Sequence, residues 1–542
     1  MSTVTDPTPD DTEKTADSGQ LAGASTARII AVLAAIVLFT EVVPLQYFMV
    51  SVALQKMTSS FPNVGANINW TIIILGLVGA SATPLLAKMA DIWGKKRIFI
   101  LCGLFFIVGC LIDALTHSWT WFLIGRGLQA FAIATQAISW ALVRDLLPRK
   151  WVPIGLGVTA TGMGFSGVLA PIVAGYLVDH YDWRMMFWVL GVFTLIMVPI
   201  VMIVVPESTR RVKDRIDPVG AVLLSVGVAL TLIYLDKGQD WGWGRPTTFA
   251  WLIAGLALLV AFYVVEARIS RPLVDVKLLS QPKVSLVLLM GLLGVGILAV
   301  QSYALGYMTQ TPSQDQLHGI VSQGVVDKAH EMVGVNLPLS AVQLHFDPGY
   351  TYGDGFTLMQ YALHIGIVAG LVGMIFGPLG GYLTTRVGGR IVAIMALAIM
   401  TGTGIGYALL PYSWTTYAIL AAVFGIGFGF LYSSVPILVT EAVPPEQHAI
   451  SSGMLGVTFS MGTSIGLAIV TALLNNSPVK AQINVMGNKF TQVIPQVFAD
   501  RGYSLGFLVM SGFSFIALLI AVFMRHGRKP ATGGIEAMTA GH

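Results

Sequence analysis

Long apolar segments alternate with short polar ones along almost the whole chain. An α-helix needs about 20 apolar residues to cross the hydrocarbon core of a bilayer. By this criterion we predict membrane-spanning helices at 28–54, 69–90, 98–115, 119–143, 152–178, 186–205, 218–236, 249–267, 284–309, 356–384, 391–411, 415–440, 449–474 and 504–524. The predicted fold is therefore an all-α membrane protein with fourteen transmembrane helices.

Composition supports a membrane protein and argues against an enzyme. Of the 542 residues, 55% are hydrophobic and only 11% are charged, too few charges for a soluble protein of this size. The sequence contains no nucleotide-binding loop, no His/Cys cluster with metal-ligand spacing and no polar catalytic domain. We expect no cofactor, no bound metal and no nucleic-acid partner, and we expect Cys102 and Cys110 to be apolar packing residues.

The distribution of basic residues predicts the orientation in the membrane. Most of the 31 Lys and Arg residues fall on one side, including GKKR (94–97), RRVKDR (210–215) and RHGRK (525–529). Basic loops stay in the cytoplasm, so both termini are predicted to be cytosolic. We expect residues 1–27, which lack signal-peptide features, and residues 525–542 to be cytosolic tails. The expected location is the cytoplasmic (inner) membrane of a bacterium.

The chain contains an internal repeat with a period of about 295 residues. The segment LVRDLLPRKWVPIG (142–155) parallels LVTEAVPPEQHAISSG (438–453), and AKMADIWGKKR (87–97) parallels GGYLTTRVGGR (380–390). We therefore predict two six-helix bundles, 28–205 and 284–524, with two additional helices in the linker 206–283. Membrane proteins built from repeats hold substrate at the repeat interface and expose it to each side in turn.

Two polar motifs of the first half are similar to signatures of the major facilitator superfamily. AKMADIWGKKR (87–97) resembles the loop motif after the second span, with matches at Asp91, Gly94, Lys95 and Lys96. IGRGLQAFAIATQ (124–136) resembles the Arg-x-x-Gln-Gly motif of the fourth span, with matches at Arg126 and Gln129. The resemblance implies a conformational switch at the loop, to which we add Arg144, and a functional role for the buried arginine.

A third motif and the two linker helices narrow the resemblance. GMGFSGVLAPIVAGY (162–176) resembles the fifth-span motif of antiporters, with candidates at Gly167, Pro171 and Gly175. Together with DWRMMFW (182–188) and the linker helices, it makes the chain similar to the fourteen-span drug:proton antiporter family. The resemblance implies export of lipophilic small molecules, driven by the proton gradient.

Glu41 lies in the middle of the first apolar run, within LFTEVVPLQYFMVSVAL (38–54). The family places an aspartate in this span, and alignment puts Gln46 at that position. A glutamine cannot carry a proton. We therefore hypothesise that Glu41 carries the proton close to Arg126; the alternative is a structural glutamate. Asp113 is expected near a helix end, where water reaches it.

Further side chains in the spans are candidates for a substrate cavity. We assign Gln46, Tyr47, Phe48, Gln129, Trp140, Tyr361 and His364 to it, although aromatic residues and a lone histidine also occur as simple packing residues. The segment 310–355 is predicted to be extracytoplasmic, with a short amphipathic helix at VVDKAHEMVGV (325–335). It is either a lid, a docking site for an accessory protein or a passive loop.

Three functions fit these observations. The first is a proton-coupled multidrug antiporter that works as a monomer, with lipophilic substrate, protons and membrane lipids as its partners. The second is a dedicated exporter or flippase of an endogenous lipid, siderophore or metabolite, not necessarily coupled to protons, which Gln46 favours. The third is a receptor or scaffold that transports nothing and would give no substrate flux in vesicles.

Overall fold

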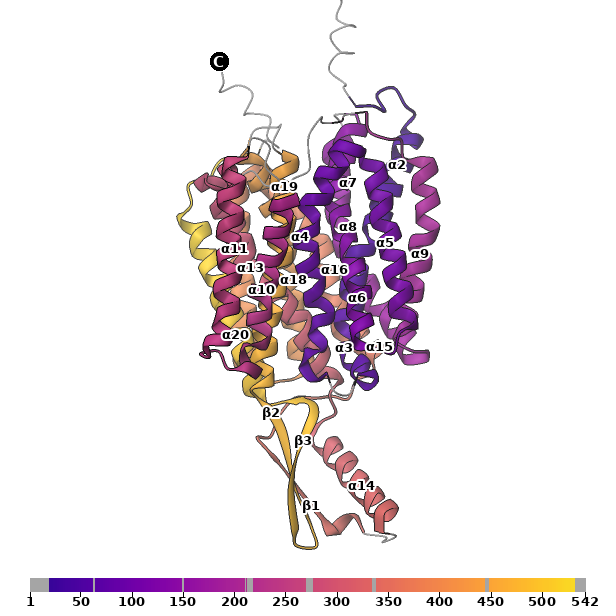
Figure 1. Ribbon diagram of the computed structural model, residues 1–542, viewed down its shortest axis with the longest axis vertical. Helices are drawn as coiled ribbons and strands as arrows, with labels where there is room; N and C mark the ends of the chain where they lie inside the picture. The colour runs from indigo at the N-terminus through magenta and orange to yellow at the C-terminus, as the bar shows by residue number, and fades with distance from the viewer. Residues whose placement is uncertain are drawn as a thin grey trace, which may run out of the picture.

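The computed structural model describes residues 19–61, 64–148, 151–209, 211, 218–269, 276–333, 338–443 and 448–531. Helices follow the apolar runs, and most of them stand side by side in one bundle (Figure 1). Within the described residues, eleven helices are long and apolar enough to cross a membrane. An all-helical bundle of this kind satisfies every backbone polar group inside the helix, as the lipid interior requires.

The first half runs from α2 to α9 and corresponds in residues to the predicted segment 28–205. Its helices are α2 (Thr26–Thr40), α3 (Val42–Met57), α4 (Trp70–Trp93), α5 (Lys95–Leu115), α6 (Trp119–Ala130), α7 (Ala134–Leu146), α8 (Val152–His180) and α9 (Arg184–Val204). Two predicted spans are interrupted: the first at Glu41, and the fourth by a 3-10 turn at Phe131–Ile133. Pro44 has no amide hydrogen, which accounts for the break at Glu41, one turn earlier.

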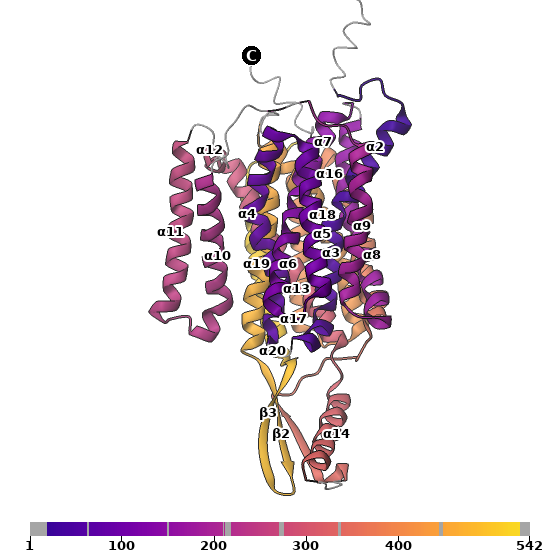
Figure 2. The same ribbon diagram turned by 45° about the vertical axis from the view of Figure 1, so that its right-hand side comes forward.

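The second half runs from α13 to α20. Its membrane helices are α13 (Pro282–Gln310), α15 (Leu358–Tyr361), α16 (Ile367–Val387), α17 (Gly389–Leu409), α18 (Trp414–Glu441), α19 (His448–Asn475) and α20 (Asp500–Phe523). A π-helical turn, η6 (Ala362–Gly366), joins α15 to α16. Between the halves lie α10 (Pro218–Trp241), α11 (Pro246–Arg268) and the short α12 (Val276–Leu279). The pair α10–α11 stands beside the main bundle, and α10 faces α4 and α19 (Figure 2).

Three of the fourteen predicted spans are not among the eleven helices that are long and apolar enough to cross a membrane. The segment 119–143 forms α6 and α7, of 12 and 13 residues, because the 3-10 turn separates them. The segment 218–236 lies in α10, whose described apolar stretch is the short Val219–Thr231. The segment 152–178 lies in α8, which includes residues whose side chains are not described. The count of fourteen spans therefore stays a prediction.

Beyond one end of the helices lies a small sheet that the sequence analysis did not predict (Figure 1). Strands β1 (Val342–Asp347), β2 (Pro478–Val485) and β3 (Asn488–Phe498) form an antiparallel sheet in that order, with Val342 opposite Val485. Helix α14 (Gln314–Val333) contacts β1. It begins eleven residues before the predicted amphipathic helix at 325–335.

Hydrogen bonds attach the sheet to the second half. The Tyr352 hydroxyl donates to the Phe498 carbonyl at 2.6 Å, at the end of β3. The Tyr350 hydroxyl donates to the Pro312 carbonyl at 2.9 Å, and the Tyr307 hydroxyl of α13 donates to Gln496 Oε1 at 3.3 Å. These three tyrosines are buried. The Tyr307 bond therefore joins β3 to α13, and the Tyr352 bond joins β3 to the chain between β1 and α15.

Candidate functional site

A buried arginine is the centre of a polar cluster in the first half. The Arg126 side chain, on α6, has 0% of its surface exposed. Its Nε donates to the Thr71 carbonyl at 3.0 Å, and its Nη1 donates to Gln46 Oε1 at 3.3 Å and to Gln129 Oε1. The Phe187 ring of α9 lies 5.6 Å from its Cζ. The predicted candidates Gln46 and Gln129 therefore belong to this polar cluster.

A carboxylate completes the cluster. Asp113, on α5, is also 0% exposed, and its Oδ2 accepts a hydrogen bond from Gln129 Nε2 at 2.8 Å. The expectation of a water-exposed Asp113 near a helix end is therefore wrong. Helix α6 packs closely over the end of α5, because Gly109 and Gly125 face each other: a methyl group at Gly125 would lie 2.0 Å from Asp113 Oδ1.

Glu41 belongs to a different hydrogen-bonded group. Its side chain is buried, and Ser166 of α8 donates to its Oε2 at 2.5 Å. Gly162, also on α8, leaves the space for the other oxygen, since a methyl group there would lie 1.7 Å from Glu41 Oε1. We expected Glu41 to lie close to Arg126, but Arg126 bonds Gln46 instead. The reason is geometric: five residues turn a helix by about 140°, so the two side chains face different neighbours.

A pocket lies between the two halves, and it contains two of the predicted cavity residues, Phe48 and Tyr361. It is lined by Phe48 and Val52 of α3, by Gly167 and Pro171 of α8, and by Leu298, Gln301, Ser302, Tyr361, Ile365, Gly366, Ala369, Gly370, Phe424 and Phe428 of the second half. Most of these side chains are apolar or aromatic. Ligand sites commonly combine such a lining with a few polar groups, here Gln301, Ser302 and the Tyr361 hydroxyl.

The other cavity candidates lie outside this pocket. Tyr47 packs against Phe48 with ring centroids 5.6 Å apart, in a T-shaped arrangement. Trp140 is partly buried on α7. His364 is exposed in the π-helical turn, where its ring contacts Phe356 and Trp414. The His364 side chain is therefore exposed and does not line the pocket.

The glycine motif of α8 forms a close contact with the second half. A methyl group at Gly370 of α16 would lie 2.7 Å from the Gly167 carbonyl carbon, and one at Gly175 would lie 2.8 Å from Met359 Cα. A methyl group at Gly366 would lie 3.1 Å from Pro171 Cβ. The three predicted motif residues therefore all lie where α8 packs against the second half: Gly175 at α15, Pro171 at η6 and Gly167 at α16. Small side chains let helices approach closely there.

At the same interface, Asp179 bonds the start of α15. Its Oδ1 accepts from the Leu358 amide at 3.2 Å and its Oδ2 from the Met359 amide at 2.8 Å. A carboxylate is favourable at a helix N-terminus, where amide groups lack partners. Sequence reasoning missed this residue, because the partner amides lie in the other half and have no local signature.

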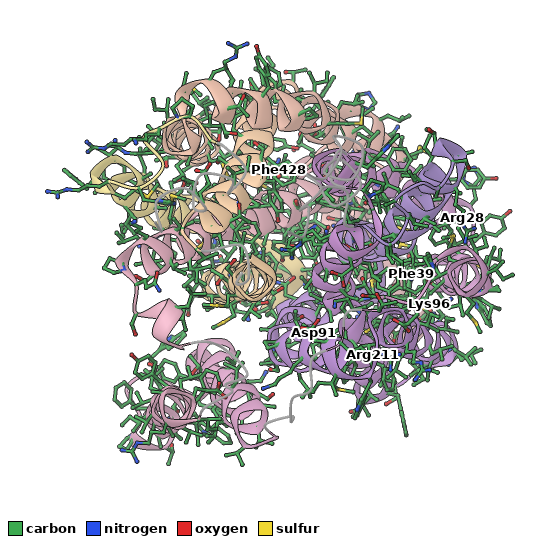
Figure 3. All side chains as sticks on the ribbon, turned by 90° about the horizontal axis from the view of Figure 1, so that it is seen from above. Arg28, Phe39, Asp91, Lys96, Arg211 and Phe428 are labelled. Carbon is green, nitrogen blue, oxygen red and sulfur yellow. The ribbon has the colours of Figure 1, made fainter. Side chains whose placement is uncertain are left out.

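The predicted switch residues lie together at the end of the first half opposite the sheet. Lys95 Nζ lies 3.0 Å from Asp91 Oδ1 and 2.9 Å from Asp145 Oδ2. The Lys96 amide donates to Glu207 Oε1 at 3.0 Å. Figure 3 shows Asp91 and Lys96 on the helices of the first half, seen from this end.

The last two switch residues have distinct places in this cluster. Gly94 separates α4 from α5 with φ 117°, a conformation that favours glycine. Arg144 lies one residue before Asp145 on α7, and its Nε donates to the Trp140 carbonyl at 3.4 Å. The cluster thus ties the α4–α5 turn to the end of α7 and to the chain after α9.

A bundle of long apolar helices with a buried polar cluster and a pocket between its two halves is typical of a membrane transporter. The family model of the Major Facilitator Superfamily matches residues 33–326 and 329–541, so the chain belongs to that superfamily. The resemblance seen in the sequence motifs is thereby confirmed. Family membership and the transporter relatives identify the chain as a transporter and not an enzyme.

Relatives cover most of the chain at low identity. Methyl viologen resistance protein SmvA of Salmonella typhimurium is 25% identical over 458 residues, 81% of each chain. Multidrug resistance protein Stp of Mycobacterium tuberculosis is 24% identical over 79% of this chain and 73% of its own. The uridine/deoxyuridine transporter of Lactococcus lactis is 25% identical over 83% of this chain and 87% of its own. A crystal structure of the peptide transporter POT has 15% identity and a TM-score of 0.58, covering 91% of this chain and 93% of its own, which shows the shared fold.

Proposed function

We propose that the protein exports lipophilic small molecules across the cytoplasmic membrane in exchange for protons. In this proposal the chain has fourteen spans and cytosolic termini, and it alternates between two states in which the pocket opens to opposite sides. The pocket between the halves carries the proposal, because its lining is mainly apolar and aromatic and contains no charged side chain among the described residues. The relatives named for methyl viologen resistance and multidrug resistance support export of small molecules.

The close contact between α8 and α15–α16 supports alternating access. It lies toward the end of the bundle that carries the sheet, where Asp179 also bonds the second half. Gln310 Nε2 of α13 donates to the Val52 carbonyl at 3.0 Å, which adds another bond between the halves. With the sheet outside the cell, this state is closed to the outside, and export requires these contacts to separate.

Proton coupling is assigned to Glu41 and Arg126. Glu41 is a buried carboxyl at a break in the first span, and a carboxyl that moves between water and an apolar site can carry a proton. Its partner Ser166 lies on α8, the helix that contacts the second half. Protonation of Glu41 would weaken the charge-assisted bond to Ser166 and so alter the contact between α3 and α8.

The test is ethidium efflux from cells that lack their main pumps. We expect wild type to expel the dye, a protonophore to stop it, and Glu41→Gln to reduce it at least tenfold at equal expression, because the amide keeps the bond from Ser166 but cannot carry a proton. The exposed Glu331 on α14 provides the control, Glu331→Gln, which should behave as wild type. Proton-dependent efflux by Glu41→Gln at the wild-type rate would exclude Glu41 as carrier.

Gln46 supports a second candidate function, a dedicated exporter of one endogenous lipid, siderophore or metabolite. Its neutral amide bonds Arg126 where the family has an aspartate. The nucleoside transporter among the relatives is also consistent with a specific substrate. If wild type expels no dye from a broad panel, this candidate replaces the multidrug pump. In either case we expect a monomer, and we place the docking surface for an extracytoplasmic accessory protein on α14 and the sheet.

A further inference from the structure

We infer that Asp113 is a second proton-exchanging carboxyl of this transporter and acts on Arg126 through Gln129. The inference deepens the proposed function and rests on it for the coupling of protons to transport. Glu41 and Asp113 bond different side chains from different helices, so the two carboxyls form two separate sites.

Asp113 supplies the negative charge that the Arg126 cluster needs. The groups that hydrogen-bond the guanidinium are neutral: the Thr71 carbonyl of α4, the Gln46 amide of α3 and the Gln129 amide of α6. A buried charge without a counter-charge is costly. In the described part of the chain, the charged group acting on Asp113 is Arg126, and Asp113 in turn acts on the Cys110 thiol, one turn earlier on α5.

The bridge through Gln129 fixes which oxygen can take a proton. Gln129 accepts from Arg126 with Oε1, so its Nε2 is the group that donates to Asp113 Oδ2. The other oxygen, Oδ1, has no hydrogen-bond partner among the described residues. A proton taken from water would form an O–H bond at Oδ1 and neutralise the carboxylate. Oδ2 would remain a carbonyl oxygen that still accepts the bond from Gln129.

Protonation would leave Arg126 without a counter-charge. Three polar atoms of this cluster's side chains also lack hydrogen-bond partners within the described residues: Arg126 Nη2, Thr71 Oγ1 and Gln46 Nε2. Of these atoms, only Thr71 Oγ1 of α4 can accept a new bond from the guanidinium, because Arg126 Nη2 of α6 and Gln46 Nε2 of α3 are themselves donors. Because Arg126 bonds Gln46 of α3, a change at Asp113 that moves the guanidinium would also act on α3, the helix that lines the pocket with Phe48 and Val52.

The experiment is infrared spectroscopy of the full-length protein in lipid nanodiscs during a pH titration. A protonated carboxyl has a C=O stretch that carboxylates and amides lack, and its frequency identifies a carboxyl shielded from water. We expect Asp113→Asn to remove one such band from the wild-type difference spectrum and Asp113→Glu to restore a band. Asp182→Asn, at an exposed carboxylate bonded to Arg184, is the matched control and should keep the wild-type spectrum.

The outcomes separate this inference from the proposed function. If Asp113→Asn gives the wild-type spectrum, or if Glu41→Gln alone removes every shielded carboxyl band, Asp113 does not exchange protons and the inference fails. The spectrum requires no substrate, so a wild type that expels no dye would overturn the proposed multidrug function and leave this result unaffected. Proton-driven efflux by Asp113→Asn at the wild-type rate and pH profile would refute the inference while the proposed function stands.

Discussion

A methyl group at Gly370 should shift the transporter away from the state described here. In Gly370→Ala the new methyl would lie 2.7 Å from the Gly167 carbonyl carbon, whereas ordinary contact begins at 3.4 Å. Helices α8 and α16 must therefore separate by about 0.7 Å at this point. The atoms opposite the methyl belong to the backbone of α8, so a side-chain rotation cannot relieve the clash.

The magnitude follows from the cost of overpacking. Extra methyl groups in a tightly packed interface cost about 1–3 kcal/mol. The contact exists only when α8 and α16 are together, so this cost falls on one of the two alternating states. A difference of about 1–3 kcal/mol changes their ratio by about 5- to 150-fold. Gly377→Ala on the same helix is the control, because no described atom lies within 4 Å of its methyl.

Double electron–electron resonance measures this shift directly. Spin labels at Tyr181 and Leu363, both exposed and near this end of α8 and η6, report the separation of the halves once Cys102 and Cys110 are replaced by alanine. We expect Gly370→Ala to add or enlarge a long-distance population and Gly377→Ala to keep the wild-type distribution. Identical distributions for all three proteins would refute the reasoning that this contact distinguishes the two states.

Two further substitutions test other parts of the fold. Asp179→Ala removes both acceptors for the amides that begin α15, so we expect a longer distance between the same spin labels, with Asp179→Asn intermediate because it retains one acceptor; an unchanged distance would show that these bonds do not hold the halves together. Gly94→Ala places a side chain at φ 117°, where non-glycine residues cost about 1–3 kcal/mol, and 2.9 Å from the Glu207 carboxylate. We expect a lower unfolding temperature in detergent for Gly94→Ala. An unchanged unfolding temperature would show that a side chain at this position causes no strain.

The helices and the buried arginine could be predicted from sequence, because their signals are local. Apolar runs give the helices, and an arginine within such a run must find polar partners inside the protein. Gly94 likewise marks the turn after α4 through its own conformation. The motif residues Gly167, Pro171 and Gly175 indicated close packing, which the structure places between α8 and the second half.

The partners of these residues could not be predicted, because they come from distant segments. Asp113 is only two residues from the end of α5, and sequence position alone suggested access to water. Its burial depends on how closely α6 packs against it at Gly125, a tertiary property. Ser166 and Gly162 became neighbours of Glu41 only when α8 was placed beside α3. Glu41 and Gln46 are only five residues apart in the chain, yet Gln46 bonds Arg126 and Glu41 bonds Ser166.

The order of strands in the sheet has a consequence for biosynthesis. Strand β1 precedes α16 in the chain, whereas its partner β2 follows α19. The ribosome therefore makes β1 long before the hairpin of β2 and β3 exists, and non-local pairings of this kind form late. During that interval the pairing edge of β1 is open, and α14, made just before β1 and in contact with it, is an element against which β1 can already pack. Pairing of β1 with β2 would then occur only in a chain whose helices up to α19 have been inserted in the correct order.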